Sequence, residues 1–157
     1  TAIKKGIMQS MTEGPLTGSN CQNIRVCIYD GKMHAVDSND ISFQLAASHA
    51  FKEAFNEARP QLLEPYYQLE VLCEDAYTGD VMGDLQTRRA IIQGMDTDGH
   101  YQKIISEVPL AELKDYGSTL RSLTQGKAKF KLEFSNYQLV PTHVQESLVI
   151  SNAVLSE

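Results

Sequence analysis

Two stretches in the first third of the chain carry apolar residues at the spacing of a helix. The first covers residues 1–11, and Gly14-Pro15 then favours a stop, because proline cannot continue a helix. The second covers Ile41–Ala58, whose apolar residues fall on one broad face. Residues 37–40 offer several side chains that can cap its free amides, and Arg59-Pro60 ends it. We therefore predict two helices here.

Between these helices the pattern changes to that of a strand pair. Residues 23–29 alternate apolar with polar positions, which is typical of a half-buried strand. Asp30-Gly31 predicts a tight turn, after which residues 34–36 return as a short second strand. Two helices and one strand pair are too few for a balanced domain, and Thr1 is not an initiator methionine. We therefore expect a fragment whose first domain lacks N-terminal strands.

After Pro65 the elements follow a different order. Alternating and helical patterns predict a strand, a helix, two strands joined at Asp98-Gly99, a helix and a strand. The segments are, in the same order, Gln68–Cys73, Thr78–Arg89, Ala90–Met95, Gln102–Val108, Leu110–Thr124 and Lys127–Phe134. This β-α-β-β-α-β order is that of the ferredoxin-like split fold. Val144–Leu155 predicts a closing helix.

Charge and composition argue against several classes of function. The formal net charge is −6, which speaks against a protein that coats DNA or RNA by electrostatics alone. No apolar run approaches the roughly 20 residues that a membrane helix requires, and residues 1–6 do not resemble a signal peptide. The three cysteines and four histidines show no metal-ligand spacing. We expect no membrane, DNA or metal partner.

No catalytic constellation is recognisable in the sequence. It contains neither the GxxxxGK[ST] loop that cradles nucleotide phosphates nor a GxSxG nucleophile elbow. We therefore expect no catalytic and no cofactor-binding residue in this chain.

Several segments resemble elongation factor G, a bacterial translational GTPase, and they occur in that family's order. They are Ala2–Gly18, Tyr29–Phe43, Leu62–Pro65, Gly79–Arg89 and Val108–Gly126. The first is similar to the helix and GPLAG turn of the family's domain IV, the second to its YDGSYHDVDSSEMAF tip loop, and the third to its LLEP passage into domain V. Departures at Ser19-Asn20, Lys32-Met33, Thr87 and Ala90 leave open whether the parent is the housekeeping factor or a close paralogue.

The resemblance implies an α+β fold class and a division into domains. Residues 1–62 are expected to be the C-terminal part of domain IV, a partial ribosomal-protein-like α/β domain. Residues 63–142 are expected to be the ferredoxin-like domain V, and residues 143–157 a C-terminal helix and tail.

The resemblance also implies a function. It identifies the chain as the ribosome-contacting region of a GTPase that promotes tRNA–mRNA translocation during protein synthesis. Domain IV would reach the small-subunit decoding centre with its tip, and domain V the large-subunit factor-binding region. The GTPase centre of the family lies upstream, so GTP and magnesium belong to the missing N-terminal domain and the fragment itself is no enzyme. We expect a cytoplasmic monomer.

The most pointed site candidate is His34, which follows the predicted turn. An imidazole can donate hydrogen bonds to phosphate or ribose and can stack on a base. An idle surface histidine is the alternative, but this position matches the family's tip histidine. The neighbours Asp30, Gly31, Lys32 and Met33 would shape and present the tip.

Three arginines in the second half are further candidates for rRNA contact. Arg88 and Arg89 end a predicted helix, where they can also complement the negative end of the helix dipole. Arg121 points away from the apolar stripe of its helix, so a solvated position is the alternative. The resemblance to domain V favours contact for all three.

Other functions compete with this interpretation. The parent could be a paralogue that acts in ribosome recycling or ribosome protection. A different class is a ferredoxin-like ligand-binding module, which would need a polar, Gly-rich effector loop, whereas residues 96–100 predict a plain hairpin turn. An RNA-recognition motif has the same element order, but the strand with Phe130 and Phe134 lacks its sequence pattern, and alternating phenylalanines favour a core position.

Overall fold

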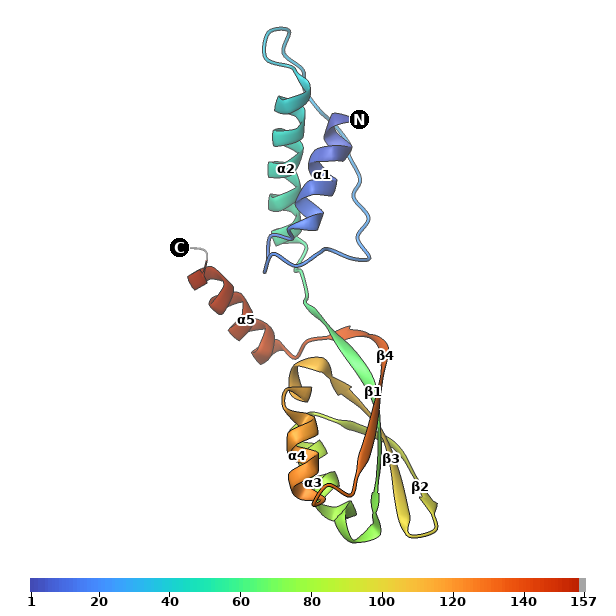
Figure 1. The fold of residues 1–157 in the computed structure, drawn as a ribbon. Helices are drawn as coiled ribbons and strands as arrows, with labels where there is room; N and C mark the ends of the chain where they lie inside the picture. Colours follow the sequence, from blue (N-terminus) through green and yellow to red (C-terminus); the bar gives the residue numbers. More distant parts are fainter. Residues whose placement is uncertain (156–157) are drawn as a thin grey trace. The chain divides into compact units, whose positions relative to one another are not determined.

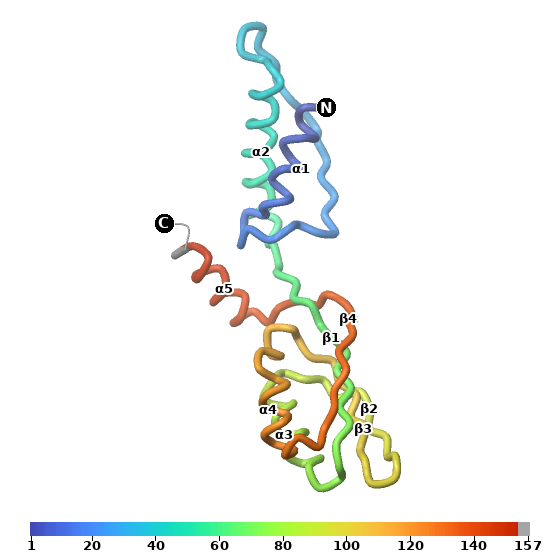
Figure 2. Tube along the Cα trace, viewed as in Figure 1, coloured from blue at the N-terminus to red at the C-terminus, as the bar shows by residue number. Residues whose placement is uncertain are grey.

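The computed structural model describes residues 1–155, which form two compact units (Figures 1 and 2). Unit 1 contains Thr1–Leu62 together with the chain from Pro141 onward, and unit 2 contains Leu63–Val140. The chain therefore leaves unit 1, forms unit 2 as a continuous segment, and returns to unit 1.

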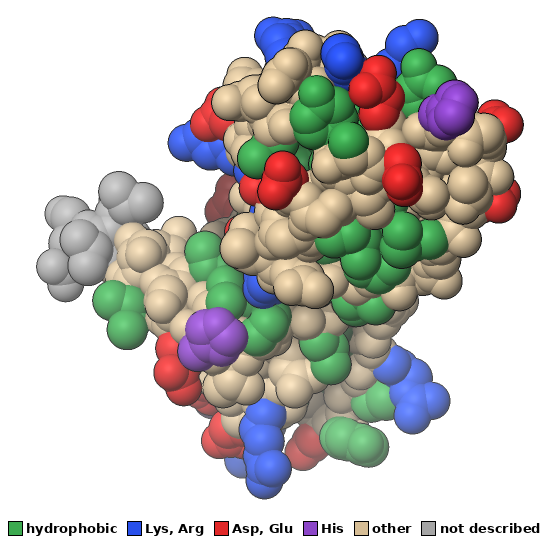
Figure 3. Space-filling view, turned by 90° about the horizontal axis from the view of Figure 1, so that it is seen from below, with side chains coloured by type: hydrophobic (Ala, Val, Ile, Leu, Met, Phe, Trp, Pro, Cys, Tyr) green, Lys and Arg blue, Asp and Glu red, His purple; other side chains and the backbone are tan. Residues whose placement is uncertain are grey.

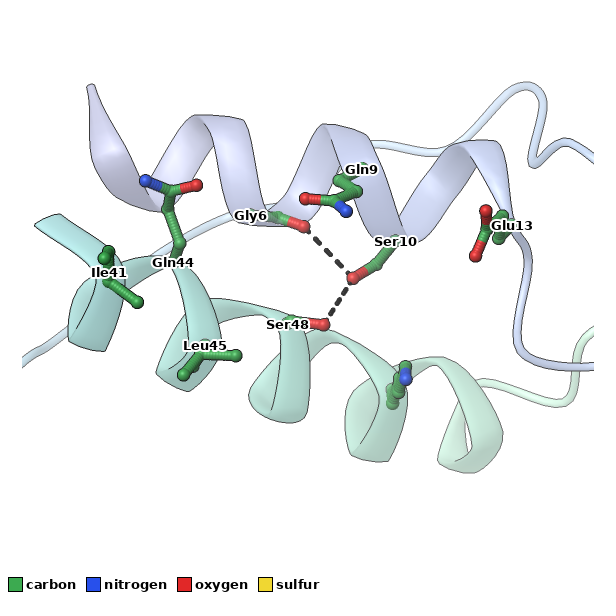
Figure 4. A pocket seen from close by; sticks show the side chains of 9 residues that line it. Gly6, Gln9, Ser10, Glu13, Ile41, Gln44, Leu45 and Ser48 are labelled. Carbon is green, nitrogen blue, oxygen red and sulfur yellow. Dashed lines mark hydrogen bonds between the residues drawn. The ribbon is translucent and has the colours of Figure 1, made fainter.

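Unit 1 is built on two helices that lie against each other, α1 (Ala2–Thr12) and α2 (Asp40–Glu57). Small residues allow the close approach, because Gly6 and Ser10 are buried where α1 meets α2. Ser10 Oγ donates to the Gly6 carbonyl at 3.0 Å and lies 2.7 Å from Ser48 Oγ on α2 (Figure 4). Both predicted helices are confirmed.

The start of α2 is fixed by its cap. Asn39 has extended backbone, and its side-chain oxygen accepts a hydrogen bond from the Ser42 N–H at 2.8 Å. This bond satisfies one of the free amides of the first turn. The capped helix then runs for 18 residues to Glu57, with Phe51 buried on its inner side.

The predicted strand pair of unit 1 is wrong. Residues 23–34 form neither a strand nor a hairpin in the structure, and the turn that precedes α2 lies at residues 35–37 rather than at Asp30-Gly31. Figure 2 shows this segment as a long extended connection between α1 and α2. The alternation is real, but a strand also needs a neighbour for its N–H and C=O groups. Unit 1 contains no strand among the described residues.

Unit 2 is a four-stranded antiparallel sheet with two helices. The elements are β1 (Leu63–Glu74), α3 (Thr78–Thr87), β2 (Ile91–Asp98), β3 (Tyr101–Pro109), α4 (Tyr116–Leu123) and β4 (Lys129–Leu139). Short 3₁₀ helices at Asp75–Tyr77 and Leu110–Leu113 complete it. The spatial order is β2-β3-β1-β4, and β1 pairs antiparallel with both neighbours. The predicted ferredoxin-like fold is confirmed.

The core of unit 2 lies between the sheet and the helices, which cover one face of the sheet (Figure 1). Every second residue of β1 faces these helices, and the central side chains are fully buried. The core residues are Leu69, Val71, Cys73, Val81, Leu85, Ile104, Val108, Tyr116 and Leu120. Burial of this apolar surface is the main source of stability for the unit.

Two details of unit 2 differ from the prediction. The helix expected at residues 110–124 is divided, because Asp115 takes a left-handed conformation with φ 59° between the 3₁₀ turn and α4. Phe130 lies at the margin of the core, with its ring edge-on to Tyr116 at a centroid distance of 5.4 Å, yet 42% of the residue is exposed. Its contact with α4 places it on the helix-covered side of the sheet, unlike an RNA-recognition aromatic.

The last element is α5 (Thr142–Leu155), where the sequence predicted a closing helix from residue 144. The structure groups this helix with unit 1, although unit 2 immediately precedes it in the chain.

Candidate functional site

The tip loop, residues 29–38, is exposed throughout except at the half-buried Ser38. Tyr29, Met33 and Val36 are 95%, 76% and 91% exposed, far beyond what is usual for large apolar side chains. Lys32 and His34 are exposed as well. Nothing in the described part of the chain covers these side chains.

Local hydrogen bonds give the tip loop a defined shape. The Asp30 carboxylate accepts from the Gly31 N–H at 2.7 Å, and Ser38 Oγ accepts from the His34 N–H at 2.7 Å. The second bond closes the loop just before the Asn39 cap. Because these bonds use backbone donors, the side chains of Lys32 and His34 stay available to a ligand.

The tip loop carries basic and aromatic side chains. A lysine and a histidine can contact phosphate, and the exposed tyrosine ring can stack on an unpaired base. The sequence prediction named Asp30, Gly31, Lys32, Met33 and His34 but missed Tyr29. The available signal was its place at the start of Tyr29–Phe43, the segment that resembles the family's tip loop.

The structure gives Arg88 partners inside unit 2. Its guanidinium forms an ion pair with Asp84 at 2.8 Å and donates to the carbonyl of Glu112 at 2.6 Å. It also donates to Thr119 Oγ1 at 3.2 Å and lies 5.1 Å from the centre of the Tyr116 ring. This arginine ties the end of α3 to the start of α4.

Arg89 is held in the same way, on the other side of the α3 terminus. Its guanidinium forms two hydrogen bonds with the buried Glu64 carboxylate, at 2.7 and 3.0 Å, and one with Glu112 at 2.9 Å. The hydrogen bonds that Arg89 donates to Glu64 raise the pKa of Arg89 still further above its ordinary value, although burial opposes them. Arg89 therefore stays charged and fixes the beginning of β1.

Arg121 differs from these two, since its side chain is exposed on α4 as the sequence predicted. Contact of Arg88, Arg89 and Arg121 with rRNA stays a prediction. Arg121 is the freest of the three to make it.

One face of the molecule carries side chains of mixed kinds. Figure 3 shows basic, acidic and hydrophobic side chains interspersed over the visible face. Within residues 1–155, no group of three or more histidine, cysteine, aspartate or glutamate side chains could hold a metal ion. None of the helices in that described range is long and apolar enough to cross a membrane.

These features define an α+β chain of two units, one ferredoxin-like and one presenting an exposed loop at the head of a capped helix. Comparison with protein families shows to which family a chain with these features belongs. Residues 1–59 match the family model of elongation factor G, domain IV, and residues 61–148 match that of the elongation factor G C-terminus. The chain belongs to the elongation factor G family.

Individual relatives agree with this assignment. The chain is 44% identical to elongation factor G of Thermotoga neapolitana and 45% identical to that of Aquifex pyrophilus, in each case over 94% of this chain and 21% of the relative. It also resembles a crystal structure from Thermus thermophilus, with a TM-score of 0.83 and 43% identity over 97% of this chain and 23% of that one. The chain spans about a fifth of the length of the curated relatives it matches.

Proposed function

We propose that this chain is the ribosome-contacting region of a translational GTPase that promotes the movement of tRNA and mRNA. The observation that carries the proposal is the tip loop. It is an exposed loop shaped by local hydrogen bonds, it carries a lysine and a histidine of the kind that can contact RNA, and the chain belongs to the elongation factor G family.

In this proposal residues 1–62, which belong to unit 1, are the C-terminal part of domain IV, and their tip loop enters the decoding centre of the small subunit. His34 and Lys32 contact RNA there, while Asp30 and Gly31 set the shape of the loop and Met33 presents apolar surface. Unit 2 is domain V and contacts the factor-binding region of the large subunit, with Arg121 as its most accessible basic group.

The chemistry of GTP is assigned to another part of the full-length protein. GTP and magnesium would bind in an N-terminal domain outside this chain, and hydrolysis there would drive the cycle to which units 1 and 2 supply contact and shape. The full-length protein would work in the cytoplasm as a monomer.

Cosedimentation of the full-length protein with ribosomes, with GTP or a non-hydrolysable analogue, tests the proposal. We expect binding that is stronger with the analogue and is lost when the chain described here is deleted. A protein that stays in the supernatant under all conditions would contradict the proposal.

A paralogue is the second candidate, because Lys32-Met33 in the tip loop departs from the family's usual Ser-Tyr. A factor for ribosome recycling would split post-termination ribosomes yet fail to move tRNA. Measuring both activities in one reconstituted system separates these two functions.

A further inference from the structure

A polar contact joins α5 to the segment that follows α2. The side-chain oxygen of Gln145 accepts from the Leu62 N–H at 2.9 Å, and its side-chain nitrogen donates to the Pro60 carbonyl at 3.3 Å. All of these groups lie in unit 1, and both bonds are partly buried. One amide side chain therefore connects positions more than 80 residues apart in the sequence.

The two backbone groups that Gln145 contacts, one donor and one acceptor, explain why a glutamine fits here. In an extended segment, the carbonyl of one residue and the N–H of the residue two positions later point to the same side. A neighbouring strand normally supplies the matching donor and acceptor. The side-chain amide of Gln145 has one of each, so it takes the place of a strand for residues 60–62.

Other side chains at this position satisfy only part of that requirement. A glutamate accepts but cannot donate, and a lysine donates but cannot accept. A methionine of the same length offers neither group. Partly buried backbone groups that lose their partner are costly, so the segment that follows α2 depends on an amide at position 145.

Two apolar side chains of α5 bury little surface. Its apolar residues Leu148 and Ile150 are 47% and 65% exposed, so burial of these side chains contributes little to holding the helix. The family model of the C-terminus extends through residue 148 and thus includes the first half of α5 with unit 2. The contacts in the structure group the helix with unit 1 instead.

We propose that Gln145 docks α5 onto the segment that follows α2, which makes the C-terminal helix a structural part of the unit that carries the tip loop. The α2 helix lies between the two features: it begins at the Asn39 cap beside the tip loop and ends at Glu57, after which Ala58 and Arg59 lead to residues 60–62. In this scheme Gln145 holds the segment that follows α2, the helix whose first turn adjoins the tip loop. The inference does not depend on the proposed function.

Hydrogen exchange of the Leu62 amide, measured by NMR on the whole 157-residue chain, tests the inference. Gln145→Met removes the amide group but keeps side-chain length and helix propensity. Glu146→Met makes the same kind of change at the next, exposed position of α5 and serves as the control. We expect exchange at Leu62 to accelerate about fivefold or more in Gln145→Met, the factor that corresponds to one net hydrogen bond, and less than about twofold in Glu146→Met.

Three outcomes would overturn the inference. Leu62 could exchange at the unprotected rate in the wild-type chain, which would mean that the bond is absent. Gln145→Met could leave the exchange rate unchanged. Both variants could accelerate it equally, which would mean that the amide has no special role. None of these results bears on ribosome binding, so they leave the proposed function standing.

Discussion

The substitution Gly6→Ala is expected to force α1 and α2 apart. A Cβ atom built on Gly6 lies 2.9 Å from both the Cα and the carbonyl carbon of Gln44, and closer still to its carbonyl oxygen. All three atoms belong to the backbone of α2, so no side-chain rotation can relieve the clash. The hydrogen bond between Ser10 and Ser48, one turn further along, depends on the same close approach.

The magnitude follows from three opposing effects. Overpacking a close contact costs about 1–3 kcal/mol, and loss of one hydrogen bond adds about 1 kcal/mol. Alanine is favoured over glycine inside a helix by about 0.5–1 kcal/mol, which offsets part of that cost. We therefore expect Gly6→Ala to destabilise the α1–α2 pair by about 1–3 kcal/mol.

A second glycine provides the control for this measurement. Gly83 lies inside α3, and a Cβ atom there would meet nothing within 4 Å. Gly83→Ala should therefore stabilise α3 by about 0.5–1 kcal/mol. Residue-resolved hydrogen exchange reports each helix separately. Equal or greater protection of α1 and α2 in Gly6→Ala would refute the packing described for unit 1.

Three further predictions concern unit 2 and the thiols. The Tyr116 hydroxyl is buried without a hydrogen-bond partner among the described residues, and burial raises its pKa. Tyr116→Phe should therefore leave the free energy of unfolding unchanged, or raise it by up to about 1 kcal/mol, in chemical denaturation. Arg89→Ala should lower the stability of unit 2 by about 1–3 kcal/mol in the same assay, because the buried Glu64 carboxylate loses its ion-pair partner. Unchanged stability would show that the ion pair contributes nothing. Iodoacetamide at neutral pH should alkylate the exposed Cys27 in the native protein but Cys73 only after unfolding, because burial both shields the Cys73 thiol and raises its pKa. If mass spectrometry found Cys73 modified first, that result would contradict the core described for unit 2.

The fold of unit 2 was predictable because each element carries its own local signal. Alternation identifies β1 and β3, and apolar residues at helical spacing identify α3 and α4. The left-handed residue Asp115 was not predictable, since aspartate there gives no signal as clear as glycine would.

The strand pair of unit 1 failed for a related reason. Residues 23–29 have the alternation of a strand, but a strand exists only together with the neighbour that accepts its hydrogen bonds. Periodicity describes one segment at a time and cannot supply that neighbour.

In the candidate site, too, contacts between residues far apart in the sequence could not be predicted. The place of the tip loop, with His34 and Lys32, was predictable from the resemblance, whereas the turn expected at Asp30-Gly31 lies at residues 35–37 instead. The internal partners of Arg89 were not predictable, because Glu64 and Glu112 lie 25 and 23 residues away in the sequence. Only the fold brings these charges together, and it shows that a basic residue at a helix end can serve structure as readily as RNA.

The central claim is that the tip loop acts on RNA during translocation, and the rate of single-turnover translocation by full-length protein tests it most directly. We predict that His34→Ala slows this rate roughly 10- to 150-fold, which corresponds to losing one hydrogen bond to a charged group, while ribosome binding and GTP hydrolysis change less than about twofold. His49→Ala, at an exposed position of α2 away from the tip loop, should leave all three unchanged. An unchanged translocation rate in His34→Ala, or an equal loss of GTP hydrolysis, would contradict the account.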